Sequence, residues 1–229
     1  MKTELTTLFV TSLAVVSGYG AVYNVFNGTS PTSNANGIAP TGVFSDPDGA
    51  PKAGSFTGMQ STATVPAGIV AFGIFFATDA ELRAADSLTN LVSAFKIFGT
   101  SGAFNQPGPT GYRGVFVRNT SATVTGTPFA GQNIYAFVGN GTTFANSTEL
   151  AIIKSASMFE ASQDAIPTAK SVILSMATST LIFGVMLENV KTTNNDASTT
   201  PGWGMAGVPE TSTALLGALG SLVFLRRRR

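Results

Sequence analysis

Residues 68–77 read Gly-Ile-Val-Ala-Phe-Gly-Ile-Phe-Phe-Ala, a nearly continuous apolar run that follows a second β-favouring stretch at 62–66. Ile, Val and Phe favour strands, and an apolar run without polar alternation is typical of a strand that is buried on both faces. Turn-forming residues flank the run, as expected for the ends of a strand. The pattern predicts a central strand over 68–77.

The segment after this strand has the signals of a helix. Thr78 and Glu81 have the spacing of a capping box, in which the hydroxyl and the carboxylate each bind the other residue's backbone N–H. Ser87 can cap a second segment, in which Leu88, Leu91, Val92 and Phe95 form an apolar stripe that Gly99 ends. We expect one amphipathic helix, over about residues 79–98, packed on the sheet.

The rest of the body alternates short β runs with turn residues. A run at 22–26 precedes a stretch rich in Gly, Pro, Ser and Asn at 28–58, where we expect loops. Further runs lie at 112–118, 122–125, 132–138, 149–155, 170–176 and 180–187, and Gly139-Asn140-Gly141 can supply positive φ for a hairpin turn. This spacing predicts a mainly β domain, an antiparallel sandwich or barrel-like fold.

The composition excludes several classes of chemistry. The chain has 229 residues with no Cys and no His, and charged residues make up only 11%. Thiol nucleophiles, histidine general bases, disulfide frameworks and most zinc or haem sites are therefore excluded. The body has a slight acidic excess between residues 21 and 207 and offers no basic footprint for nucleic acid. We expect no cofactor.

The first twenty residues have the pattern of a secretory signal. Lys2 precedes an apolar run at 5–16, and the small residues Gly18, Gly20 and Ala21 mark the cleavage region. As a helix this run would measure about 18 Å, too short for a hydrocarbon core of roughly 30 Å. We therefore expect a signal helix that the secretion translocon engages and signal peptidase removes.

The other end of the sequence contains a hinge, an apolar run and a basic stop. Val208, Pro209, Glu210 and Thr211 are followed by an apolar run at 214–225 and then by Arg226, Arg227, Arg228 and Arg229. The run gives about 18 Å of helix, which is a marginal membrane span. Four arginines are retained on the cytoplasmic side, so the body faces outward. An ordinary single-pass anchor and a buried core helix are the alternatives.

These three parts resemble the PEP-CTERM sorting signal of bacteria with polysaccharide-producing envelopes. Pro209 and Glu210 match its Pro-Glu-Pro motif, Thr211 stands where the family prefers Pro, and the apolar run and the arginines match its remaining parts. The resemblance implies recognition by an exosortase, a membrane-embedded processing enzyme. It also implies cleavage near Pro209-Glu210 after transient anchoring in the inner membrane by an apolar helix, and final placement at the cell surface or outside the cell.

The body also resembles exported proteins that carry this tail, through Phe72-Gly73, the stretch 95–99, and the stretches 130–135 and 138–141. That group has no activity to carry over, and the resemblance implies a compact β domain. The expected organisation is a signal peptide at 1–20, a β-rich exported domain at 21–190, a polar linker at 191–207 and a PEP-CTERM-like sorting tail at 208–229.

Carboxylates, lysines and aromatic residues are the remaining candidates for chemistry. Asp46 and Asp48 could ligate calcium, but the twelfth position of an EF-type loop would be Thr57, so the pattern favours a plain turn and no metal. Lys96 and Lys154 lie in no catalytic motif, and Trp203 could stack on a sugar. A hydrolase would need two facing carboxyl groups, and the candidates are Asp79, Glu81, Asp86, Glu149, Glu160, Asp164 and Glu188.

Each of these carboxylates also has a structural explanation, as a helix cap, an exposed helix face, an edge strand or a loop. The leading interpretation is therefore a non-enzymatic, structural or adhesive protein of the cell surface or extracellular matrix, with extracellular polysaccharide as a candidate partner. The alternatives are a carbohydrate- or calcium-dependent binding module and a secreted carboxylate-dependent hydrolase.

Overall fold

The computed structural model describes residues 20–27, 36–44, 52–59, 68–104, 113–162, 168–192 and 199–208. Most of the expected signal, the Asp46–Asp48 turn, Asp164 and the sorting tail from Pro209 onward lie outside these residues. The described elements, in chain order, are β1 (Ala21–Asn27), β2 (Ile38–Phe44), β3 (Lys52–Thr57), β4 (Ile69–Phe75), α1 (Asp79–Arg83), α2 (Leu88–Ala94), β5 (Phe95–Ile97), β6 (Val117–Ala122), β7 (Asn133–Gly139), the 3-10 helix η1 (Phe144–Asn146), β8 (Glu149–Met158), β9 (Lys170–Leu174), β10 (Thr180–Phe183), β11 (Val185–Lys191) and β12 (Thr199–Gly207).

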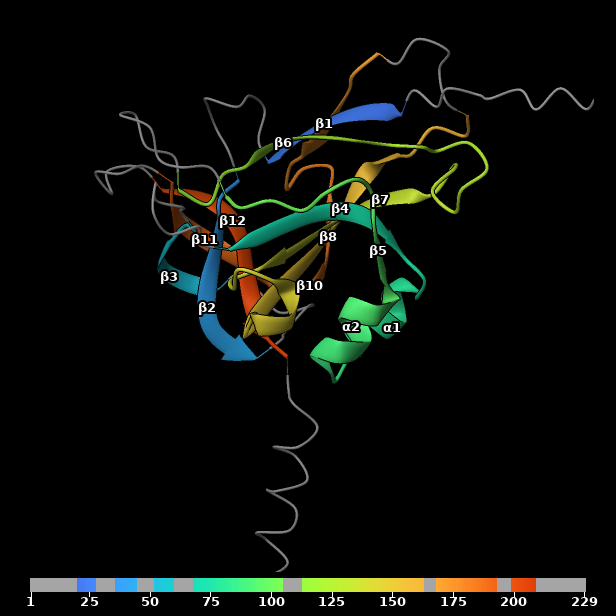
Figure 1. Cartoon of the computed structure of the whole chain (residues 1–229). Helices are drawn as coiled ribbons and strands as arrows, with labels where there is room; N and C mark the ends of the chain where they lie inside the picture. Colours follow the sequence, from blue (N-terminus) through green and yellow to red (C-terminus); the bar gives the residue numbers. More distant parts are fainter. Residues whose placement is uncertain are drawn as a thin grey trace, which may run out of the picture.

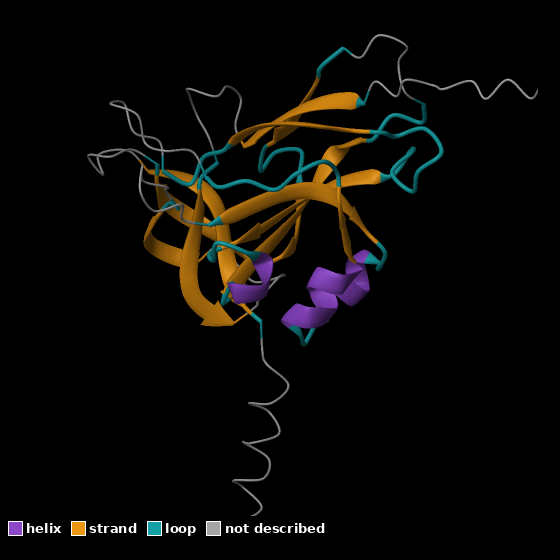
Figure 2. Ribbon diagram, in the orientation of Figure 1, coloured by secondary structure: helices purple, strands orange, loops and turns teal. Residues whose placement is uncertain are grey.

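The fold is mainly β, as predicted, and its strands form two sheets (Figures 1 and 2). The small sheet has the order β6-β1-β9. The large sheet has the order β3-β11-β12-β8-β7-β4-β5, with β10 also paired to β8 and β2 to β12. One apolar core contains residues of both sheets, including Val25 and Val172 of the small sheet and Phe72 of the large sheet, which is consistent with a sandwich.

The opposite face of the large sheet is covered by the short helices (Figure 2). A second core there contains Leu82 of α1 and Leu91 of α2, together with Phe137 and Ile152 from β7 and β8. The predicted strand at 68–77 is confirmed as β4, whose seven residues are all buried. Burial on both faces explains why its apolar run shows no alternation.

The single helix expected over 79–98 is instead two short helices and a strand. The capping box of Thr78 and Glu81 is present, and Ser87 caps α2 as expected. However, the chain becomes extended at Phe95, and Phe95–Ile97 pairs with β4 as β5. The edge of β4 has backbone N–H and C=O groups that a continuing helix could not pair with. The helix therefore ends at Ala94, about one turn before the expected end at residue 98.

The expected loop region at 28–58 contains two strands. β2 pairs in parallel with β12, and β3 pairs in parallel with β11. β1 also pairs in parallel with β9. The sequence predicted an antiparallel fold, whereas both sheets contain parallel pairs. Each of these pairs joins an early strand to one from the last third of the chain, and such long-range pairing leaves no hairpin signal in the local sequence.

The linker expected at 191–207 is wrong for its second half, because β12 occupies 199–207 and the β domain therefore continues to Gly207. This strand pairs with β11, β2 and β8, and Trp203 within it is fully buried. A side chain at Gly202 would meet the carbonyl of Gly37, and one at Gly204 would meet Val185. Glycine at these two positions allows close packing between the strands.

Three smaller expectations also differ from the structure. The run at 180–187 is broken at Gly184, with φ of +125°, so that β10 pairs with β8 and β11 with β12. A single strand, β6, replaces the runs at 112–118 and 122–125. The β7–β8 connection includes η1, and neither Gly139 nor Gly141 has positive φ.

Candidate functional site

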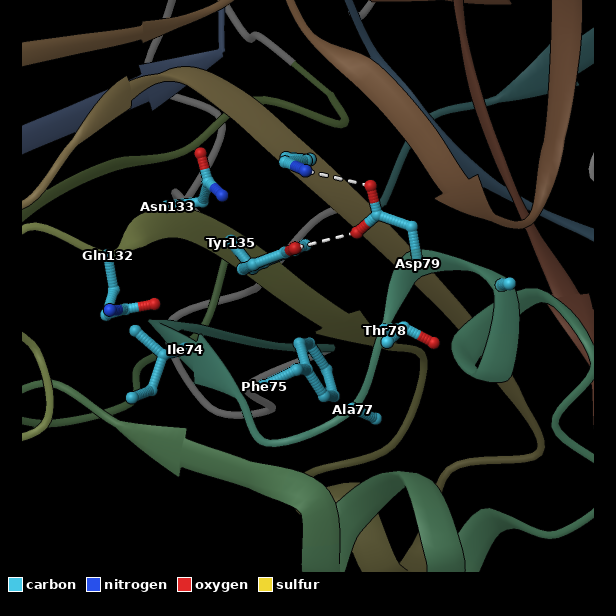
Figure 3. A pocket seen from close by; sticks show the side chains of 10 residues that line it. Ile74, Phe75, Ala77, Thr78, Asp79, Gln132, Asn133 and Tyr135 are labelled. Carbon is cyan, nitrogen blue, oxygen red and sulfur yellow. Dashed lines mark hydrogen bonds and ion pairs between the residues drawn. The ribbon is translucent and has the colours of Figure 1, made fainter.

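A groove of about 500 Å³ lies where β4 passes into α1, beside the first residues of β7 (Figure 3). Two acidic or basic side chains line it, Asp79 and Lys154, together with polar and small residues. The full lining is Ile74, Phe75, Ala77, Thr78, Asp79, Ala80, Gln132, Asn133, Tyr135 and Lys154.

Three of these side chains form a connected cluster. Tyr135 of β7 and Lys154 of β8 are paired across the sheet, so their side chains lie on the same face. Asp79, the first residue of α1, lies over that face. The Tyr135 hydroxyl donates to its Oδ1 at 2.7 Å, and Lys154 Nζ binds its Oδ2 at 2.8 Å. Lys154 Nζ also lies 5.7 Å from the centroid of the Tyr135 ring.

The electrostatics of this cluster keep Asp79 ionised and Tyr135 protonated. Partial burial acts to raise the pKa of Asp79, but hydrogen bonds from Lys154 and Tyr135, with the charges of Lys154 and Arg83, outweigh it and lower the pKa below 3.8. Burial, and then the hydrogen bond to Asp79 and its charge, raise the pKa of Tyr135 well above its ordinary value. Neither group exchanges a proton near neutral pH, as a general acid or base would need to. The cluster is suited to holding α1 on the sheet and to presenting fixed polar groups.

A second groove, of about 400 Å³, lies between α1 and α2 and has two of the predicted carboxylates in its lining, Glu81 and Asp86. The Glu81 carboxylate accepts hydrogen bonds from the Thr78 backbone N–H at 2.7 Å and hydroxyl at 2.8 Å. These bonds lower the pKa of Glu81. The carboxylate serves as the helix cap that its spacing predicted.

The remaining predicted carboxylates lie elsewhere. Glu149, at the start of β8, is 8% exposed and accepts hydrogen bonds from the backbone N–H groups of Thr41 and Gly42. Glu160 forms an ion pair with Lys170 at 3.3 Å, and Glu188 is exposed on β11. The described residues thus place one acidic side chain in the first groove and two in the second. Among them, no three His, Cys, Asp or Glu side chains gather as a metal site requires.

Trp203 and the two tyrosines among the described residues are not available to stack on a sugar. Trp203, on β12 between β2 and β11, is fully buried, so it offers no surface on which a sugar could stack. Tyr23 and Tyr135 are 2% and 7% exposed. Lys96 is exposed on β5, and Lys154, considered as a catalytic amine, instead forms the ion pair with Asp79.

The residues that border the expected cleavage sites on the side of the β domain lie within the described part of the chain. Ala21 is the first residue of β1 and is buried, and Gly20 lies against the backbone of Ala122. Val208 follows β12 directly and packs, partly buried, against the core beneath the helices. No helix in the described ranges is long and apolar enough to cross a bilayer.

Comparison with family models, with curated proteins and with solved structures gives no match for this chain.

The Asp79–Tyr135–Lys154 cluster was not predicted as a unit. Alternation along a strand can indicate at most which face of the sheet Tyr135 or Lys154 lies on, and it does not say which residue lies opposite. Their pairing depends on the β7–β8 register, and the approach of Asp79 depends on how α1 folds back.

Proposed function

We propose that this chain is an exported, non-enzymatic protein that is sorted through its C-terminal segment to the cell surface or the extracellular matrix, where it has a structural or adhesive role. The observation that carries the proposal is the order of three parts in the sequence: Pro209-Glu210, the apolar run at 214–225, and the arginines at 226–229. In this proposal the apolar run forms a transient helix in the inner membrane and an exosortase-type enzyme processes the motif.

The boundaries of the β domain support this proposal. β1 begins at Ala21, so removal of a signal peptide after Gly20 would leave the first strand intact. β12 ends at Gly207, one residue before Val208 and two before Pro209. The expected cleavage positions therefore flank the ordered strands rather than interrupting them.

The roles of the acidic side chains support a non-enzymatic domain. Asp79 is bound by Tyr135 and Lys154, Glu81 forms a helix cap, and Glu149 binds backbone N–H groups. A glycosidase-type pair needs one carboxyl group that holds a proton near neutral pH. The pKa values of Asp79 and Glu81 are both lowered, which opposes that role.

The test is to express the full chain in a Gram-negative host with and without a matching exosortase and to measure the mass of the mature protein. We expect loss of the signal in both hosts and loss of the tail only with the exosortase. A Pro209→Ala/Glu210→Ala double variant should keep its tail, while the exposed-site control Glu188→Ala should be processed normally. A tail that stays intact in the host with the exosortase would overturn the sorting proposal, and a signal that stays intact would overturn export.

A further inference from the structure

We propose that the groove beside Asp79 binds a neutral, polyhydroxylated ligand, such as a sugar residue. The proposal concerns the β domain itself and does not depend on how the chain is sorted. It is carried by the charge balance of the groove, its mixture of hydrogen-bond donors and acceptors, and the way its side chains are held in place (Figure 3).

The charge balance favours a neutral ligand. Asp79 and Lys154 are the charged side chains in the lining, and they form an ion pair at 2.8 Å. An anion entering the groove would be attracted by the ammonium group and repelled by the carboxylate. A cation would be attracted by the carboxylate and repelled by the ammonium group. Neither gains the net attraction that a single-sign site provides.

The unused hydrogen-bonding capacity favours hydroxyl groups. Each oxygen of Asp79 accepts one hydrogen bond from the cluster, and a carboxylate has about four acceptor positions. An ammonium group has three donors, of which Lys154 gives one to Asp79. Figure 3 shows the amides of Gln132 and Asn133 across the groove from Asp79, and each amide both donates and accepts. A hydroxyl group also does both, so neighbouring hydroxyls on one ligand can bind such a mixed lining.

The site is also largely preformed. Asp79 is held by Tyr135 and Lys154 and lies between the two capping-box residues, Thr78 and Glu81, and Lys154 lies beside the Tyr135 ring. Side chains that are already ordered lose little freedom when a ligand binds. A volume of about 500 Å³ lies within the range of small-molecule sites.

The experiment is a titration of the ¹⁵N-labelled full chain, in a zwitterionic detergent that contains no sugar, followed by amide chemical shifts. The probes are glucose, mannose and maltose, with glucuronate, glucosamine and inorganic phosphate as charged comparisons. We expect a neutral sugar to shift the amides of residues 78–80 and 132–135. Asn133→Ala leaves the Asp79 ion pair intact, and it should weaken binding about fivefold, the effect of losing one hydrogen bond.

Lys170→Met, which removes an ion pair with Glu160 outside the groove, is the matched control and should bind as the parent does. Three results would overturn the proposal: no shift at the groove with any of the three neutral sugars, stronger binding of a charged probe, or equal affinity in Asn133→Ala and the parent. None of these results bears on the mass measurement that tests sorting, so the two proposals fail separately.

Discussion

Replacing Glu149 with alanine should destabilise the place where β2, β8 and β12 meet. The Glu149 carboxylate accepts hydrogen bonds from the backbone N–H of Thr41, at 3.0 Å, and of Gly42. The Thr41 hydroxyl in turn donates to the Met205 carbonyl at 2.7 Å, and Gly207 lies opposite Glu149 in the sheet. The Glu149 carboxylate therefore joins the start of β8 to the middle of β2, and the Thr41 hydroxyl joins β2 to β12.

The expected magnitude follows from the two hydrogen bonds. Bonds to a charged group contribute about 1.5–3 kcal/mol each, and the N–H groups of Thr41 and Gly42 can take up water when the carboxylate is removed, so we expect a loss of about 3 kcal/mol. In a domain of this size 1 kcal/mol shifts the melting temperature by roughly 2–4 °C, which gives a decrease of about 6–12 °C. Glu149→Gln keeps one acceptor and should lose about half as much.

Thermal unfolding of the purified variants, followed by circular dichroism, tests this magnitude. Hydrogen exchange should also become faster at the amides of Thr41 and Gly42. Glu188→Ala, at an exposed position on β11, is the control and should change stability by less than about 0.5 kcal/mol. Melting temperatures for Glu149→Ala and Glu149→Gln that both match the control would refute the argument, because the carboxylate would then contribute no more than an exposed one.

Three further predictions follow from the structure. Gly184→Ala should lower the free energy of unfolding by about 2–4 kcal/mol, because φ is +125° and the new Cβ would lie 2.5 Å from the Gly204 carbonyl oxygen. Gly126→Ala, with φ of +70° and open space around it, should cost only about 1 kcal/mol; equal denaturant midpoints would contradict this difference. The pKa of Asp79 is lowered in the folded state, so its ionised form stabilises the fold above pH 3.8, and this contribution disappears as the pH falls through the lowered value. The stability advantage over Asp79→Asn, measured by denaturant titration across acid pH, should therefore shrink below pH 3.8, and an advantage that is unchanged there would count against the ion pair. Finally, the single tryptophan, Trp203, is fully buried. Its fluorescence should be blue-shifted and protected from acrylamide, whereas emission typical of an exposed indole would exclude the position of β12.

The candidate site was predicted in part. The Thr78–Glu81 capping box was readable from the sequence because its partners are three residues apart, and the structure confirms it. The contact of Asp79 with Tyr135 and Lys154 spans 56 and 75 residues. No local spacing encodes such contacts, because they form only when α1, β7 and β8 are brought together.

The sequence alone determined the β class of the domain, the strand at 69–75, the strands at 133–139, 149–158 and 170–174, and the start of the first helix. These features depend on short-range physics: apolar runs, β-branched residues and a capping motif act within a few residues of one another. Tertiary structure decided the rest. The Gly-rich stretch around Trp203 became a buried strand, β12. Residues 38–44 and 52–57 became strands by pairing with β12 and β11, which lie more than a hundred residues away in the sequence. A backbone that is paired and buried must satisfy its N–H and C=O groups wherever partners are available, and for these segments the partners exist only in the assembled sheet.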